Sequence, residues 1–270
     1  MGKKIILALA PTGGWGKAYH NPVDPEEISQ QIITCVKNGV SVIHLHARNH
    51  YGELTTDLSF LQKTIRLVKE NCDVIIEAST GGLSNLNAQE RAMPLKLQSI
   101  ELGSLNMGSL NFLDKVYINS LPDIRYWLKS MASCHVKPSM EIFDTSNIGL
   151  SKDLIKKGFV KPQFNFNFIF NYKWGMTFTP DILELLKSIL PEKSVWGVII
   201  GNNKDFSMHI QAALNGAAMI RVGFEDSRIC NNKEVNSNFD LVKAIKIQLE
   251  KTGFELADPN ESRKILGLLY

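Results

Sequence analysis

Two histidines lie two residues apart in the segment HLHAR (residues 44–48), which ends an apolar run typical of a β-strand. Successive side chains of a strand point to opposite faces, so His44, His46 and Arg48 share one face. Zinc in a catalytic site typically takes three protein ligands and leaves one position open. Glu225 is the best third ligand, because two histidines and a glutamate form a known zinc set. The alternative is a pair of hydrogen-bonded histidines that hold no metal.

A second cluster lies in the segment RVGFED (residues 221–226). If this stretch alternates as a strand does, Arg221 and Glu225 face inward and Asp226 follows as the chain leaves the sheet. A carboxylate near a guanidinium and a metal is held ionised and oriented, which suits it to abstract a proton beside a polarised carbonyl. The alternative is an ion pair that only closes the sheet.

Polar side chains also end other predicted strands. Ser79 and Thr80 offer a hydroxyl pair, and the glycines that follow have backbone N–H groups that can approach an anion closely. An ordinary glycine turn is the alternative there. The remaining candidates at strand ends are Ser104, Asn106 and Glu141.

These residues need a scaffold that brings strand ends together, and the sequence alternates short apolar strands with amphipathic helices. The expected strands are 4–10, 41–47, 74–79, 99–105, 138–143, 163–170, 194–200 and 218–224. The expected helices are 26–38, 58–70, 87–93, 121–133, 151–157, 180–189, 205–215 and 238–251.

Eight strand–helix units in 270 residues indicate an α/β protein with a TIM (β/α)₈ barrel, as one catalytic domain over residues 1–270. A doubly wound open sheet is the alternative, although no GxGxxG segment follows the first strand. In the segment 163–170 the amides would line the barrel and the phenylalanines would pack under the helices. Barrel enzymes keep their chemistry at the C-terminal ends of the strands, which is where the candidate residues lie.

Composition limits the classes of function. The net charge is +3 without a basic block, so neither nucleic acid nor an anionic membrane is an expected partner. The longest apolar runs have the length of strands, far below the roughly 20 residues of a spanning helix. The first apolar run is better interpreted as a strand than as a signal peptide. The four cysteines form no CxxC pair, which suggests reduced thiols in a cytoplasmic protein.

These motifs together resemble the β-keto acid cleavage enzymes, whose founding activity is 3-keto-5-aminohexanoate cleavage. The resemblance runs along nearly the whole chain. The segments that carry it are TGG, NPVDPEEI, HLHAR, STGG, SLNMGSLNF, MEIFD, RVGFED and ADPNESRKILGL.

The resemblance implies a zinc-dependent TIM barrel, usually a homotetramer, that acts as an acyltransferase. Such an enzyme converts a β-keto acid and acetyl-CoA into acetoacetate and a new CoA ester. Carried over by motif, His44, His46 and Glu225 would bind zinc, which would chelate the keto oxygen and carboxylate of the substrate. Asp226, steadied by Arg221, would be the general base that takes an α-proton.

The resemblance also implies residues that bind the substrate. Ser79, Thr80 and Gly81 would hold its carboxylate and neighbouring oxygens. The side chains that would line the pocket and help to choose the substrate are Ser104, Asn106 and Glu141. The founding enzyme has an acidic residue after its first strand, suited to an amino group, whereas the segment 13–16 here is GGWG. The sequence therefore does not identify the β-keto acid.

Three other functions share features with this sequence. A metal-dependent hydrolase barrel carries its HxH on the first strand and further histidines on the fifth and sixth, where this chain has Glu141 and Asn167. A zinc aldolase-like lyase that works without CoA stays open, because no compact CoA motif is visible. A non-catalytic barrel that binds a ligand is disfavoured by the intact set of candidate ligands and base.

Overall fold

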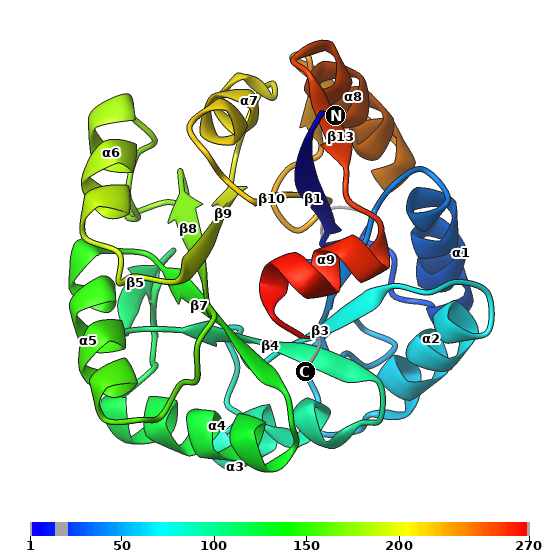
Figure 1. Ribbon diagram of the computed structural model, residues 1–270. Helices are drawn as coiled ribbons and strands as arrows, with labels where there is room; N and C mark the ends of the chain where they lie inside the picture. Colours follow the sequence, from blue (N-terminus) through cyan, green and yellow to red (C-terminus); the bar gives the residue numbers. More distant parts are fainter. Residues whose placement is uncertain (1, 14–20, 269–270) are drawn as a thin grey trace.

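Eight parallel strands form a closed barrel in the computed structural model, which describes residues 2–13 and 21–268 (Figure 1). The barrel strands are β1 (Lys3–Leu9), β2 (Val42–Leu45), β3 (Ile75–Ser79), β4 (Ile100–Asn106), β7 (Lys137–Ile142), β8 (Phe164–Phe170), β9 (Ser194–Ile200) and β10 (Met219–Val222). Each strand pairs with its neighbours, and β1 pairs with β10 in the register Leu7 to Ile220. This last pairing closes the ring, so the predicted barrel is confirmed and the open sheet is wrong.

Helices cover the outside of the barrel (Figure 1). They are α1 (Pro25–Val36), α2 (Ser59–Lys69), α3 (Ala88–Arg91), the 3₁₀ turn η1 (Met93–Lys96), α4 (Leu121–Ser133), α5 (Thr145–Lys156), α6 (Pro180–Ser188), α7 (Ser207–Leu214) and α8 (Asn238–Lys251). None of the helices in the described ranges is long and apolar enough to cross a bilayer.

The predicted start of the fifth helix is wrong by six residues. α5 begins at Thr145, because the Asp144 side chain accepts a hydrogen bond from the Ser146 N–H and forms a capping box with Asn147. The first turns of α5 consist mainly of small and polar residues and show little hydrophobic periodicity. The helical pattern of apolar residues can therefore be recognised only in the second half of the helix.

Two short hairpins follow barrel strands and were not predicted. β5 (Leu110–Phe112) pairs antiparallel with β6 (Lys115–Tyr117) after β4. β11 (Ile229–Cys230) pairs with β12 (Lys233–Glu234) after β10. Strands of two or three residues are too short to show alternation in a sequence. Both hairpins begin at C-terminal strand ends, the side that carries the candidate residues.

A short strand and a helix close the opposite end of the barrel. β13 (Phe254–Leu256) pairs with the start of β1, and α9 (Pro259–Leu266) then crosses the ring of strands (Figure 1). Leu266 packs inside the barrel with a small apolar cluster that includes Ile6 and Val42. Asn165 donates a hydrogen bond to the Leu266 carbonyl at 3.2 Å, so this inward amide of β8 serves the end opposite the candidate site.

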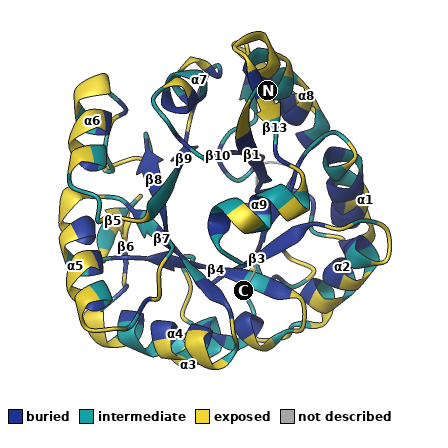
Figure 2. Cartoon of the chain, viewed as in Figure 1, coloured by how far each residue is buried: buried dark blue, intermediate teal, exposed yellow. Residues whose placement is uncertain are grey.

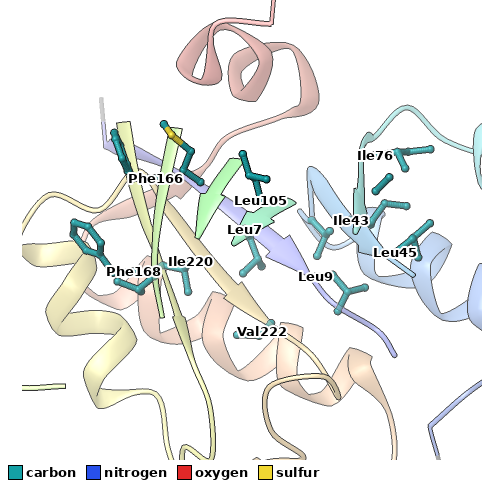
Figure 3. Packing of buried hydrophobic residues seen from close by; sticks show 14 of the residues in the cluster. Leu7, Leu9, Ile43, Leu45, Ile76, Leu105, Phe166, Phe168, Ile220 and Val222 are labelled. Atoms are coloured by element: carbon teal, nitrogen blue, oxygen red, sulfur yellow. The ribbon is translucent and has the colours of Figure 1, made fainter. Parts of the chain in front are cut away.

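The main core lies between the strands and the helices. Leu7, Ile43, Phe166 and Phe168 point outward from their strands and are fully buried (Figure 3). The buried faces of the helices turn toward these side chains, while the exposed faces turn to solvent (Figure 2). The phenylalanines of β8 therefore pack under the helices, as predicted. Dense packing of this kind fixes the strand ends that carry the site.

Gly223 is predicted to be essential for the closure of the barrel. Its φ is +144°, and a Cβ at this position would lie 2.1 Å from the carbonyl oxygen of Ala10. Gly223→Ala should therefore lower the free energy of unfolding by about 3 kcal/mol or more, because the backbone of β1 would have to move. Urea unfolding measures the change.

The matched control is Gly149→Ala inside α5, where a Cβ would meet nothing within 4 Å. This control should raise the free energy of unfolding by about 0.5–1 kcal/mol, since alanine is the better helix former. Equal stability of the two variants would contradict the assignment.

Candidate active site

A cavity of about 470 Å³ opens at the C-terminal ends of the barrel strands. It is lined by seven of the predicted site residues, namely His44, His46, Ser79, Gly81, Glu141, Arg221 and Glu225. These residues come from β2, β3, β7 and β10 or from the turns directly after them. Closure of the barrel therefore gathers side chains that lie up to 181 positions apart in the sequence into one cavity.

Three potential metal ligands meet on one wall of this cavity. His44 Nε2 lies 3.3 Å from His46 Nε2 and 3.7 Å from Glu225 Oε1, and His46 Nε2 lies 3.3 Å from Glu225 Oε2. Ligand atoms on a tetrahedral zinc ion, with bonds of about 2.1 Å, are separated by about 3.4 Å. The three side chains therefore have the donor types and the spacing of a metal site.

The position of the proton on the His44 ring is consistent with a metal ion bound by His44 Nε2. Its Nδ1 lies 2.6 Å from Glu77 Oε2, and both side chains are buried. A carboxylate only accepts hydrogen bonds, so Nδ1 carries a proton, and Nε2 is the atom that can present a lone pair to a metal when the ring is neutral. Burial works against a charged imidazole, but the Glu225 and Glu77 carboxylates outweigh it and raise the pKa of His44.

Glu77 and His46 complete this arrangement. Glu77 is paired with His44 in the register of β2 and β3, which sets both side chains on the inner face at one level. Burial opposes its ionisation, but the hydrogen bond from His44 keeps the pKa of Glu77 below its ordinary value. Burial lowers the pKa of His46 to about 4, so this ring is neutral and able to bind a metal at neutral pH.

Arg221 and Asp226 form a buried bidentate pair. Arg221 Nε donates to Asp226 Oδ2 at 3.0 Å, and Arg221 Nη2 donates to Oδ1 at 2.6 Å. Tyr172 donates its hydroxyl proton to the same Oδ1 at 2.8 Å. Burial raises the pKa of Asp226, while the Arg221 guanidinium opposes the rise. Arg221 therefore steadies Asp226, and Tyr172 is a third member of the group.

Tyr172 and Arg221 line the cavity, and both donate hydrogen bonds to Asp226, which is not itself among the lining residues. The tyrosine follows the end of β8, and its ring packs between Phe112 and Phe143, at centroid distances of 5.8 and 6.3 Å. A Cβ at Gly201 would lie 2.8 Å from this ring, so the glycine leaves room for it. The sequence gives no pattern that links Tyr172 to Asp226.

The turn after β3 contributes backbone groups as well as side chains. The Gly81 N–H donates to Ser79 Oγ at 3.1 Å, and the Gly82 N–H donates to the Tyr117 hydroxyl at 3.0 Å. Ser79, Gly81, Gly82 and Tyr117 line the cavity. Tyr117 belongs to β6, so the unpredicted hairpin forms part of the cavity wall.

Three of the predicted substrate-binding residues lie behind this wall. Thr80 donates its hydroxyl proton to the Ser104 carbonyl at 2.6 Å, and neither residue lines the cavity. Asn106 is also buried outside the lining, and its Oδ1 accepts from the Gly108 N–H at 3.3 Å. Asn106 Nδ2 has no hydrogen-bond partner among the described residues. Thr80 and Ser104 therefore support the wall of the cavity from behind.

Glu141 lines the cavity at the end of β7. Burial raises the pKa of its carboxyl group to about 7, and the nearby Arg221 limits the rise. The group can therefore donate or accept a hydrogen bond at neutral pH. Gly14, Trp15 and Gly16, of the segment where the founding enzyme of the family has an acidic residue, lie outside the described residues.

Known proteins similar in sequence belong to one enzyme family. The sequence profile of the beta-keto acid cleavage enzyme family matches residues 4–268. The 3-keto-5-aminohexanoate cleavage enzyme of Acetoanaerobium sticklandii is 34% identical over 98% of this chain and 99% of its own length. The 3,5-dioxohexanoate:acetyl-CoA acetone transferase of Paraburkholderia graminis is 28% identical over 98% of this chain and 96% of its own length.

Solved structures agree in fold. The apo structure of ObcA superposes with a TM-score of 0.78 at 16% sequence identity. The match covers 92% of this chain and 65% of the ObcA chain, so this chain spans about two-thirds of that protein. Identity at this level supports the barrel and carries no statement about activity.

Glu77→Gln is predicted to weaken metal binding about 10–100-fold, the usual effect when the hydrogen-bond partner of a ligating histidine is changed. The amide keeps the volume of Glu77 but removes the charge that fixes the His44 tautomer. Competition with a chromophoric chelator measures the affinity. Glu70→Gln, at an exposed carboxylate after α2, is the control and should leave the affinity unchanged. Unchanged affinity in Glu77→Gln would show that Glu77 does not support a metal site.

Proposed function

Since the chain belongs to the beta-keto acid cleavage enzyme family, we propose that it uses one bound zinc ion to convert a β-keto acid and acetyl-CoA into acetoacetate and a new acyl-CoA. The single observation that carries this proposal is the meeting of His44, His46 and Glu225 beside the Arg221–Asp226 pair. Relatives whose names include acetyl-CoA as a co-substrate support the second substrate.

His44, His46 and Glu225 would hold the ion, and the donor set of two imidazoles and a carboxylate suits zinc. A zinc ion there would supply positive charge beside the keto oxygen of the substrate, which makes the neighbouring methylene protons acidic. The remaining chemistry belongs to side chains of the chain.

Arg221 can hold an anionic oxygen of the substrate. Its guanidinium lines the cavity, and its Nη1 has no hydrogen-bond partner among the described residues. A buried, unpaired guanidinium N–H is costly, so a carboxylate oxygen that accepts from it would be strongly favoured. Ser79 and the turn at Gly81 and Gly82 line the same cavity and offer further polar groups to that carboxylate.

Asp226 would take the methylene proton. Its Oδ1 accepts from both Arg221 and Tyr172, whereas its Oδ2 accepts one hydrogen bond from within the described ranges, from Arg221 Nε, and keeps a lone pair with respect to these residues. Burial raises the pKa of this carboxyl group, which makes it a stronger base than an exposed aspartate. Tyr172, which lines the cavity and donates to Asp226 Oδ1, would hold the carboxylate in position.

The reaction then balances without another reactant. The carbon that has lost its proton attacks the thioester carbonyl of acetyl-CoA and forms a carbon–carbon bond. The C–S bond of acetyl-CoA breaks and CoA passes to the original acyl group of the β-keto acid. The bond between that group and the carbon that made the attack then breaks. The electron pair of that bond stays on the carbon of acetoacetate, which takes back the proton that Asp226 removed, and the original acyl group leaves as the new CoA ester.

Several finer expectations remain predictions. A homotetramer, a cytoplasmic location and one catalytic domain over residues 1–270 are consistent with the proposal and are not required by it. The role of Glu141 in the choice of substrate depends on its partner, since a carboxyl group with a pKa of about 7 accepts both cationic and neutral groups.

A panel of β-keto acids with amino, carboxylate and uncharged acyl groups tests the proposed function. Acetoacetate and a new CoA ester should form from at least one member, only when acetyl-CoA is added, and the activity should be lost on removal of the metal. Mass spectrometry detects both products. Cleavage that needs no CoA ester would favour an aldolase-like lyase, and no turnover of any member would contradict the proposal.

Two substitutions test the base and its support. Asp226→Asn should lower kcat about 10²–10⁴-fold, the usual contribution of a general base. Tyr172→Phe should lower kcat about tenfold, because a hydrogen bond to a charged group is worth about 1.5–3 kcal/mol. Steady-state kinetics and retained metal content are the measurements. Tyr126→Phe on α4 is the control for a lost hydroxyl, and equal kcat values in all three variants would exclude the assigned roles.

A further inference from the structure

Trp174 is an exposed aromatic residue at the mouth of the cavity. Its side chain is on the surface, with 68% of the residue exposed, and its φ is +72°. A bulky residue in this left-handed region is unfavourable, and so is an indole in water. The sequence thus keeps Trp174 at a position where glycine would suit the backbone better.

The indole is fixed beside the cavity. Trp174 Nε1 donates a hydrogen bond to the Leu113 carbonyl at 3.2 Å, and Leu113 at the tip of the β5–β6 hairpin lines the cavity. Tyr172, two residues before Trp174, lines the same cavity. The segment from Tyr172 to Trp174 therefore runs from the cavity wall to the outer surface.

Positive charge accompanies this apolar surface. Lys173 Nζ lies 5.1 Å from the centroid of the Trp174 ring, and Lys115 of β6 lines the cavity. Asp114 also lines the cavity at the hairpin tip, so the two lysines leave an excess of one positive charge. An aromatic ring with cations nearby binds ligands that combine apolar or ring surface with phosphate groups.

We propose that Trp174, Leu113, Lys173 and Lys115 form the surface that receives the CoA part of the CoA ester outside the cavity. The proposal rests on the proposed function, which requires a CoA thioester to reach the wall of the cavity that carries His44, His46 and Glu225. A cavity of about 470 Å³ that also holds a β-keto acid is too small for the whole CoA molecule. The pantetheine arm of CoA must therefore pass through the opening of the cavity. Outside the opening, the adenine ring and the phosphates of CoA would meet the Trp174 indole and the ammonium groups of Lys173 and Lys115.

Trp174→Gly gives the sharpest test, because the two readouts should change in opposite directions. Glycine adopts a positive φ readily, so the free energy of unfolding should stay equal or rise. Loss of the indole should weaken the binding of free CoA about tenfold, and raise KM for acetyl-CoA by a similar factor, because a base stacked on an aromatic ring contributes on this scale. KM for the β-keto acid should not change.

The binding experiment uses free CoA and the metal-loaded protein, so its result does not depend on enzymatic activity. Calorimetry gives the affinity, and CoA should quench tryptophan fluorescence less in Trp174→Phe than in the wild type. Lys173→Ala should weaken CoA binding and reduce its dependence on salt. Leu214→Ala, at an exposed leucine in α7, is the control and should leave the affinity unchanged.

Three outcomes would overturn the proposal. CoA affinity that is unchanged in Trp174→Gly would remove the assigned surface and leave the proposed function intact. A changed oligomeric state in Trp174→Gly with unchanged CoA affinity would assign the surface to contact between copies of the chain. No binding of CoA to the wild-type protein would contradict the use of acetyl-CoA itself.

Discussion

The pairing of β1 with both β2 and β10 is the constraint on which the site depends. It brings His44 and His46, which come from the second strand, within 3.3–3.7 Å of Glu225, which follows the last. Gly223 allows the backbones of β10 and β1 to approach closely at this point, since any side chain there would collide with Ala10. A slip of the register by one residue would turn the imidazoles toward the helices.

The charges around this cluster favour a bound cation. Glu77 and Asp226 are buried carboxylates and Glu225 is a mostly buried one at the same end of the cavity, and the Arg221 guanidinium contacts Glu225 and Asp226. Burial of negative charge is expensive unless it is paired. Protonation of His44, whose pKa is raised, would compensate for part of the charge in the absence of a metal. A divalent ion would do so more completely and would release that proton.

Much of the fold and of the candidate metal site follows from the sequence alone. The eight strands and most helices have strong periodicity, and His44, His46, Arg221 and Glu225 sit at strand ends, where a barrel collects functional groups. The support around them does not follow so easily. The register of β2 and β3 sets Glu77 beside His44, and the absence of a side chain at Gly201 leaves room for the Tyr172 ring. Both positions therefore depend on contacts between strands.

The cavity wall formed by the turn after β3 and the β5–β6 hairpin was the part hardest to predict from the sequence. Thr80 has the residue type of a substrate ligand, yet its hydroxyl is used by the Ser104 carbonyl. The wall is completed by the β5–β6 hairpin, whose strands of three residues are too short for a pattern to reveal. Long-range pairing, rather than local preference, decides which polar groups face the cavity.

The central claim is that His44, His46 and Glu225 share one divalent ion. Anomalous diffraction from crystals of the purified protein, recorded on both sides of the zinc absorption edge, tests it most directly. The account predicts one zinc peak per chain at about 2.1 Å from both Nε2 atoms and from a Glu225 oxygen. A fully occupied metal elsewhere, or two imidazoles that point apart with no peak between them after growth in zinc, would contradict it.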